Sequence, residues 1–540
     1  MFDVAYSDIE SKSINKRGRP EKEFSDCKDR TKRSKAVDLA GQYSLEHLEM
    51  ASISSGKTAK GYTYISSSTA LALLVDADLT KYQYETLKAV LQKEGYNILP
   101  PYMYVLDEKK KCYPENVVCS ETKASVNLQS LLDHTTHRLF ESFSKEKMKD
   151  INLECTLTSK WGCDGSSGHR EYNQSLPSDC SDKNILMASM VPLSLSTSNE
   201  SYWQNNTPSS TRLCRPISFE FTKETKEKVL DLVNTMSANI DKLNNTTVLS
   251  HGKQVTVKHN LVFTMLDGKT AQTVTNTSSG AVCYICKAKP TDMNNLEKIS
   301  QREINNESCK LGISSLHARI KFMECILHLA YNMPFKKWAV KDEKMKMIKQ
   351  ENKKRIQKEF KEKMNLRVDE VQQGTGTSND GNTSRRFFSN PSLVAEITSV
   401  DEDLIDRFRI ILQIITCGQK INSKMFKDFS WETAKLYVSK YSWYYMPCTV
   451  HKVLIHGNVI IEAAVLPLGM LSEEAEEARN KDYRKFRLMF SRKCSRVATN
   501  TDVIQRLLVS SDPFITSQRR EPRKQVLELD NIVKEMILSE

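Results

Sequence analysis

Three acidic residues stand where carboxylates could bind metal ions. Asp164 lies in WGCDGSSG, where the chain could leave a strand into a tight turn, Asp267 ends the apolar run LVFTMLD, and Glu477 lies in a late, charged helical segment. Carboxylates hold Mg²⁺ or Mn²⁺, and two such ions about 3.5–4 Å apart can stabilise the attacking and leaving oxygens of a phosphoryl displacement. An Asp-Gly pair is usually a turn, however, and the residues alone do not single these three out from 67 acids.

Two cysteines and two histidines have spacings that allow zinc binding. Cys283 and Cys286 form a CxxC pair in AVCYICKAKP, and no second CxxC follows nearby, so further ligands would come from elsewhere. His451 and His456 stand in TVHKVLIHG, within the spacing allowed for zinc. Five residues correspond to about 140° around an ideal helix, so a shared site needs a helix end or a distortion. A chance pair among ten histidines is the alternative.

A basic stripe follows Glu477 closely. From Lys481 to Arg496 there are seven Lys or Arg residues and one Asp. These residues could contact phosphates of DNA that also reaches Glu477. Tyr483, Phe486 and Phe490 recur in the same segment at helical spacing, which is more typical of core positions than of base stacking.

A second basic segment lies near the start of the sequence. Between Lys12 and Lys35 there are ten Lys or Arg residues against four acids, and the run RGRP spans Arg17 to Pro20. Such a run can lie extended in a narrow minor groove, where the negative potential attracts arginine. A solvated basic tail is the alternative interpretation.

Length and composition limit the class of protein. The chain has 540 residues, enough for three or more domains, and 39% of them are apolar. Its net charge of +12 favours a polyanionic partner, although many soluble proteins are as basic. The sequence contains no run of 18 apolar residues, so it predicts no membrane-spanning helix. The first residues, MFDVAYSDIE, lack the apolar core of a secretory signal. We therefore expect the 14 cysteines to be reduced thiols or metal ligands.

The elements that would position these residues follow from periodicity. Residues 69–145 are predicted to be helical, and 172–212, rich in Ser, Asn and Thr, are predicted to form a loop or insertion. RPISFEF predicts a strand, 222–243 a helix, and QVTVKHNLVFTML one or two strands, an order that fits a mixed α/β core. Later helices are predicted at 311–333, 340–366, 401–416, 428–440 and 471–493, with a loop at 374–384.

These motifs, in this order, resemble the large catalytic subunit of the RAG (V(D)J) recombinase and the related Transib transposases. CDGSSG and LVFTMLDG resemble the segments with the two catalytic Asp residues of the family, and CRPISFEFTKET places Glu224 at an additional metal-binding Glu. In SEEAEEARNKDYRKFR, the NK before an aromatic residue sets the register and assigns the catalytic Glu to Glu477, although Glu473, Glu474 and Glu476 crowd it.

The resemblance extends on both sides of these acids. LHARIKFME, EKMNLRVDEV and GNTSRRFF resemble pieces of an inserted zinc-bearing region, and YYMPCTVHKVLIHG places His451 and His456 on its zinc histidines, with Cys283 and Cys286 as the CxxC. GRPEKEFSDCKDRTKRSK resembles the start of a nonamer-binding domain, which implies DNA contacts by Arg17, Arg19, Lys32 and Arg33. The matching segments run from about residue 17 to about residue 515.

The family implies an RNase-H-like core with two Mg²⁺ or Mn²⁺ ions held by Asp164, Asp267 and Glu477, with Glu224 assisting, and a structural Zn²⁺. It implies nicking of double-stranded DNA at element ends, hairpin formation by transesterification and strand transfer, by a nuclear homodimer, with the need for an accessory subunit left open. The implied domains are a DNA-binding arm (1–75), a helical dimerisation region (76–155), the core (156–280), the zinc-binding insertion (281–465), the catalytic Glu helix (466–500) and a C-terminal tail (501–540).

Two other interpretations remain open at the level of sequence. A domesticated, inactive DNA-binding protein derived from such a transposase would keep the same motifs. An ordinary zinc-stabilised interaction protein is favoured only if the basic arm does not bind DNA.

Overall fold

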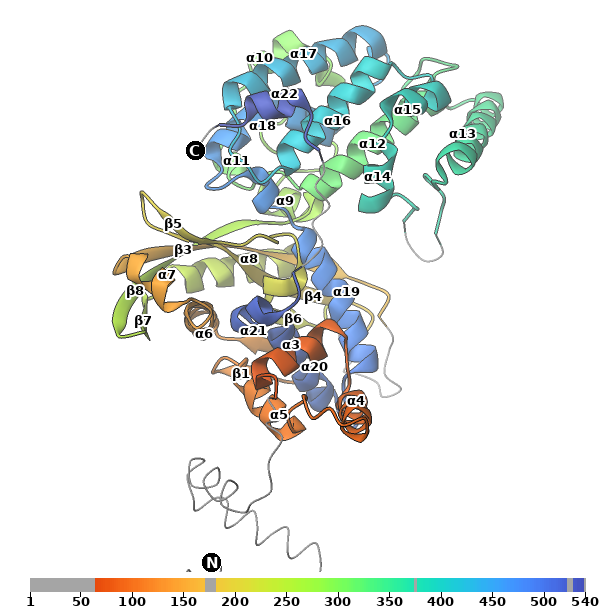
Figure 1. The fold of residues 1–540 in the computed structure, drawn as a ribbon. Coiled ribbons are helices and arrows are strands. Elements are labelled where there is room, and N and C mark those ends of the chain that lie inside the picture. Colours follow the sequence, from red (N-terminus) through yellow and green to blue (C-terminus); the bar gives the residue numbers. More distant parts are fainter. Residues whose placement is uncertain (1–63, 170–180, 373–375, 522–527, 539–540) are drawn as a thin grey trace, which may run out of the picture. The chain divides into compact units, whose positions relative to one another are not determined.

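The structure is a computed structural model that describes residues 64–169, 181–372, 376–521 and 528–538. The chain divides into two compact units, one made of Ile65–Val90 with Leu99–Glu540 and the other of Met1–Tyr64 with Leu91–Ile98. Almost all of the second unit falls outside the described residues. The described strands and the helical region (Figure 1) belong to the first unit, and so do all the predicted metal ligands.

A mixed eight-stranded sheet forms the α/β part, as the strand–helix–strand pattern predicts. Its strands lie in the order β1-β2-β6-β4-β3-β8-β7, with β5 paired to β4. Only β3 and β8 run parallel; every other described pair is antiparallel. The strands are β1 Val117–Cys119, β2 Lys123–Val126, β3 Glu154–Ser166, β4 Ile185–Ser196, β5 Ser201–Gln204, β6 Arg215–Glu220, β7 Thr246–Ser250 and β8 Lys253–Met265.

The loop predicted across 172–212 is wrong from Ile185 to Gln204, because β4 and β5 lie there. Every residue from Ile185 to Leu195 is buried, and the strand pairs with both β3 and β6. A strand covered on both faces is a continuous rather than an alternating apolar run, and ILMASMVPL is such a run set among polar neighbours. Likewise, β1 and β2 interrupt the stretch 69–145 that was predicted to be helical throughout.

Helices cover the sheet and complete its core. The helix predicted at 222–243 is α8 Lys226–Ile240, and that at 471–493 is α19 Glu474–Met489, which packs on β3 and β4. No helix was predicted after Lys493, yet α20 contacts β2 and β6 and buries Val503 and Leu507 in the sheet's core. The other helices of this part are α3 Ser67–Asp76, α4 Lys81–Lys93, α5 Tyr102–Lys110, α6 Leu128–Phe140, α7 Lys145–Asp150, α9 Gly268–Val274, α20 Arg496–Ser510 and α21 Pro513–Gln518.

The segment after α9 forms a helical region with its own continuous apolar core (Figure 1). The last helix, α22 Asn531–Met536, returns to it: Asp530 pairs with Arg409, and Ile537 bridges to Ile421. The predicted helices are α12 Ser315–Asn332, α13 Glu343–Met364, α16 Glu402–Thr416 and α17 Ser423–Tyr441, and the remainder are α10 Leu296–Ser300, α11 Asn306–Cys309, α14 Gly381–Phe387, α15 Pro391–Thr398 and α18 Cys448–Ala463.

Helix starts in this region follow capping chemistry. Ser314, Asp342, Asp401 and Asn422 each accept a backbone N–H of the first turn that would otherwise lack a partner. The charged helix α13 ends at Asn365, which takes a left-handed conformation with φ of 48°. Polar residues that flank the helical segments therefore set where these helices begin and end.

Among the described residues no single helix is long and apolar enough to cross a membrane. The helical segments Cys448–Ala463 and Leu468–Met489 reach such a length and apolar content only when they are taken together, and a bend of 85° separates them.

Candidate functional site

Asp164 and Asp267 lie at the same edge of the sheet. Asp164 is near the end of β3, and Asp267 follows β8 and caps α9 by accepting the Thr270 N–H at 2.7 Å. The strands are parallel neighbours, and Gly162 is paired with Met265, so each Asp stands two residues beyond the same rung. Gly162 is required there, because a Cβ would come 1.7 Å from the Met265 carbonyl oxygen. The parallel pairing therefore brings together two acids that are far apart in sequence.

Glu224 joins this edge from the segment between β6 and α8. A Cβ on Gly165 would lie 2.6 Å from Glu224 Oε2, so the absence of a side chain at Gly165 lets the carboxylate pack beside Asp164. Lys269 on α9 lies 2.8 Å from the same oxygen. The residue predicted as an additional metal-binding Glu is thus next to the first acid.

Helix α19 brings Glu477 to the acids. Asn480, one turn further on, donates a hydrogen bond from Nδ2 to Asp164 Oδ2 at 2.7 Å. Residues three apart lie on the same side of a helix, so this bond fixes the side of α19 that carries Glu477. The Glu477 side chain is half-exposed and pairs with Lys481 at 3.0 Å.

Burial and mutual repulsion together disfavour the charged form of Asp164 in this group. Burial, followed by the charges of Asp267, Glu224 and Glu477, raises the pKa of Asp164 to about 7. Clustered carboxylates disfavour one another's charged form, and a divalent cation removes that penalty. All four offer oxygen ligands, the type that Mg²⁺ and Mn²⁺ prefer. The type of donor therefore suits the predicted ions, but the close-set group of metal-ligand atoms among the described residues is that of Cys283, Cys286, His451 and His456, and not these acids.

The neighbouring glutamates have other partners. Glu474 pairs with Arg385 at 3.1 Å, and Glu473 accepts hydrogen bonds from Ser314 and His317. Glu476 is buried against Cys214, and burial raises its pKa to about 8. Glu477 is the most exposed of the four side chains.

His317 was not singled out from the sequence and lies beside the acids. Its Nδ1 is 3.0 Å from Glu473 Oε1 and 2.8 Å from Ser314 Oγ. The hydrogen bond with Glu473 raises the pKa of His317, and the charges of Asp267 and Glu477 add to the rise. His317 and Asp267 line one small cavity of about 40 Å³. The sequence does not indicate that His317 lies beside these acids, because that position depends on how α12 packs near the start of α19.

The predicted zinc residues converge in the helical region. The ligand atoms of Cys283, Cys286, His451 and His456 all lie within 4.8 Å of one another, and all four residues are buried. The cysteines lie in a turn closed by a hydrogen bond from the Lys287 N–H to the Cys283 carbonyl at 2.8 Å. Both histidines belong to α18, His451 in its first turn, and their rings are 5.1 Å apart at 81°. This group could hold a metal ion.

Hydrogen bonding at the same group fits metal ligation. Hydrogen bonds from the thiols of Cys286 and Cys448 lower the pKa of Cys283, which favours the thiolate that binds metal. Both ring nitrogens of His456 and Nδ1 of His451 have no hydrogen-bond partner among the described residues. Cys448 supplies a third nearby thiol that the CxxC pattern did not indicate.

Most basic residues of the stripe from Lys481 to Arg496 form ion pairs within the protein. Arg487 and Arg496 are buried against Asp182, and Arg492 pairs with Asp502. Tyr483 and Phe486 are buried and Phe490 packs against them, which confirms their prediction as core residues. Lys481 and Arg484 remain exposed on α19.

The predicted DNA-contact residues of the arm, Arg17, Arg19, Lys32 and Arg33, lie outside the described residues.

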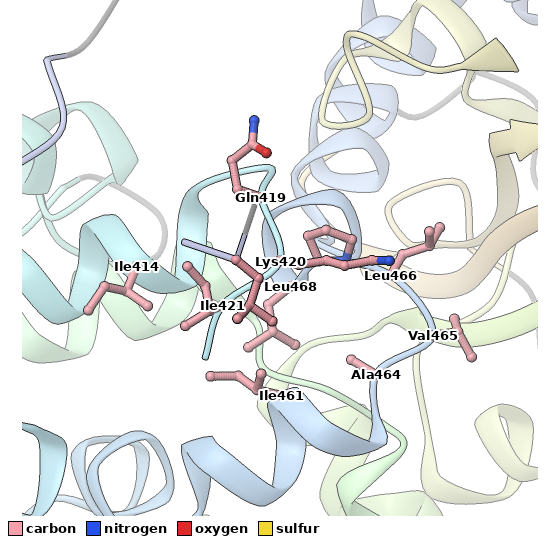
Figure 2. A pocket seen from close by; sticks show the side chains of 11 residues that line it. Ile414, Gln419, Lys420, Ile421, Ile461, Ala464, Val465, Leu466 and Leu468 are labelled. Carbon is pink, nitrogen blue, oxygen red and sulfur yellow. The ribbon is translucent and has the colours of Figure 1, made fainter. Parts of the chain in front are cut away.

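An apolar cavity of about 180 Å³ opens elsewhere in the helical region, between the ends of α16 and α18 (Figure 2). Its lining includes Ile414, Ile421, Ile461 and Leu466, with Gln419 and Lys420 as the only polar side chains. None of the predicted site residues lines it, so it offers no acid, base or metal ligand set.

No protein-family model matches the sequence, and no curated protein matches it. Among solved structures, the Drosophila P element transposase strand transfer complex is similar, with a TM-score of 0.32 and 10% sequence identity over 90% of this chain and 100% of that chain. Because one fold can serve many functions, the residues of the site carry the functional argument.

Proposed function

We propose that this protein is a metal-dependent DNA endonuclease and strand transferase of the DDE type, similar to the RAG and Transib enzymes. One observation carries the proposal: the parallel pairing of β3 with β8 sets Asp164 and Asp267 in register, beside Glu224 and the α19 residue Glu477. A mixed sheet with carboxylates at the ends of two parallel neighbours supports the RNase-H-like core that the resemblance implies.

Asp164, Asp267 and Glu477 would hold the Mg²⁺ or Mn²⁺ ions, with Glu224 assisting. When bound, such ions activate the attacking hydroxyl and stabilise the leaving oxygen in phosphoryl transfer. The protein's own part is to position charge: Asn480 orients Asp164, and the imidazole of His317, held by Glu473, lies beside the acids. The reaction would nick DNA at element ends, form a hairpin with the freed 3′-hydroxyl and end in strand transfer, with no covalent protein–DNA intermediate.

The partner would be double-stranded DNA, bound in the nucleus by a homodimer. The net charge of +12 supports a polyanionic partner. Lys481 and Arg484 are exposed on the helix that carries Glu477, where they could contact phosphates near the reacting bond. Arg17, Arg19, Lys32 and Arg33 would contact the element ends.

The Cys283, Cys286, His451 and His456 group would bind one structural Zn²⁺. Two Cys and two His residues with no open position fit the closed, tetrahedral type of zinc site. The site would tie the turn after α9 to α18, because its ligands come from these two segments.

The test is nicking of supercoiled plasmid DNA by the full chain with Mg²⁺ or Mn²⁺. We expect the wild-type protein to nick the plasmid and the variants Asp164→Ala, Asp267→Ala and Glu477→Ala to lose nicking while they still bind duplex DNA. Asp107→Ala is the matched control, since Asp107 is an exposed acid paired only with Lys110. Nicking that survives in all three variants would exclude the proposed active site.

One observation favours an inactive DNA-binding protein as the second candidate. Lys269 and Lys481 already pair with Glu224 and Glu477, so lysines could neutralise these acids without metal. The same assay separates the two functions: the inactive protein would bind DNA and leave the plasmid intact with either metal.

A further inference from the structure

Asn480 is a buried amide directly against the first acid. The residue is 7% exposed, and its Nδ2 donates to Asp164 Oδ2 at 2.7 Å. That bond joins α19 to β3, two elements that are about 300 residues apart in sequence. One oxygen of Asp164 is therefore held, and the other is left for a ligand.

Two further hydrogen bonds fix the segment before α19 to the same strand. Lys160, four residues before Asp164 on β3, is fully buried and donates from Nζ to the carbonyl oxygens of Met470 at 2.8 Å and Ser472 at 2.6 Å. Residues four apart on a strand lie on one face. Lys160 thus binds the segment that leads into α19, and Asp164 binds α19 itself. Together these contacts fix the position of Glu477 relative to β3.

An amide suits this position for an electrostatic reason. Asp164 is surrounded by Asp267, Glu224 and Glu477, so a fifth carboxylate in this group would add repulsion and a lysine would compete with a cation. Asn supplies a donor without charge. Its Oδ1 is buried and has no partner among the described residues. Such an unpaired buried acceptor costs stability, so its position beside the acids calls for an explanation other than core packing.

We propose that Asn480 is a positioning residue, which holds Asp164 Oδ2 so that the remaining carboxylate oxygens of Asp164 and Glu477 face one cation. The inference rests on the proposed function only in that Asp164 binds a divalent metal ion. It does not require that the protein cuts DNA.

The experiment compares two buried asparagines. Asn500 on α20 is 1% exposed and donates to the carbonyl oxygens of Ser120 and Glu121, so Asn500→Ala removes the hydrogen bonds of another buried helix asparagine away from the acids. Mn²⁺ binding to the zinc-loaded full chain is measured by titration calorimetry for the wild type, Asn480→Ala, Asn480→Ser and Asn500→Ala, and melting temperature is measured in parallel.

We expect both Asn480 variants to bind Mn²⁺ about 10- to 100-fold more weakly, as is usual when the partner of a ligating carboxylate is removed. Asn500→Ala should keep the wild-type affinity although its melting temperature falls as well. Wild-type affinity in Asn480→Ala, or an equal loss in Asn500→Ala, would overturn the inference. A wild-type chain that binds Mn²⁺ through Asp164 but leaves plasmid DNA intact would end the proposed function and leave this comparison valid.

Discussion

At the scale of residues, two of the four acids have weak and replaceable ion-pair partners. Glu224 and Glu477 pair with Lys269 and Lys481, whose side chains are 60% and 77% exposed. Exposed ion pairs contribute little, about 0–1 kcal/mol, so a divalent cation can displace both lysines. Sequence motifs and their order predicted the acids, but nothing in the sequence indicated what Asn480 or His317 would contact. Their roles depend on which helix packs against which strand.

The hydrogen bonds of His134, in the middle of α6, give a prediction about how stability depends on pH. His134 Nε2 donates to the Lys111 carbonyl oxygen at 2.9 Å, and Nδ1 accepts from Arg215 at 3.1 Å. Burial, with the adjacent Arg215 charge, lowers the pKa of His134 to about 4. The folded pKa lies below the ordinary 6.5, so the stabilising contribution is present above pH 6.5 and falls away as the pH drops toward 4.

His134→Gln should therefore weaken the acid sensitivity of the fold, because an amide can donate and accept without taking up a proton. We expect the wild type to lose about 2 kcal/mol through His134 between pH 7 and pH 5. Urea unfolding at the two pH values measures this difference. His169 and His259 have lowered pKa values too, so part of the wild-type sensitivity will remain in the variant. An unchanged pH dependence would contradict the assignment.

At the scale of elements, periodicity located most of the longer described helices, and it missed several short helices and the centre of the sheet. The alternation of RPISFEF and the helical spacing of 222–243 predicted β6 and α8, because each buries one face. The strand β4 buries both faces and lies in a Ser-rich stretch, so composition concealed it. Gly165 and Gly162, which allow Glu224 and β8 to approach β3, can be interpreted only once the neighbours are known.

The link between the turn after α9 and α18 gives a prediction about metal. Cys283→Ser should remove the bound Zn²⁺ and lower the melting temperature, since metal binding to such a site contributes directly to folding. Metal analysis of the purified protein and thermal unfolding measure the two effects. Cys309→Ser is the matched control, a buried thiol of the same core that lies outside the four-residue group. Zinc-free wild-type protein, or equal melting of both variants, would refute a structural zinc.

At the scale of the whole molecule, the proposed active site and the basic segment proposed to bind DNA fall in different units of the chain. The acids and the Cys and His group belong to the unit of Ile65–Val90 with Leu99–Glu540, and the basic segment from Lys12 to Lys35 belongs to the other. Target recognition by the arm and cleavage by the acids should thus be separable by mutation. Loss of the arm should weaken binding without unfolding the catalytic unit.

The arm gives the last prediction, which separates groove recognition from general charge. Arg17→Ala with Arg19→Ala should weaken binding to A·T-rich duplex DNA and reduce the slope of log affinity against log salt by about 0.9 for each DNA phosphate that the protein no longer neutralises. The matched control, Lys354→Ala with Lys358→Ala, removes the same charge from exposed positions of α13. Because a narrow A·T minor groove attracts arginine, G·C-rich DNA should lower wild-type affinity more than an exchange of A·T for T·A. Equal effects of the two double variants would mean that the arm is a solvated basic tail.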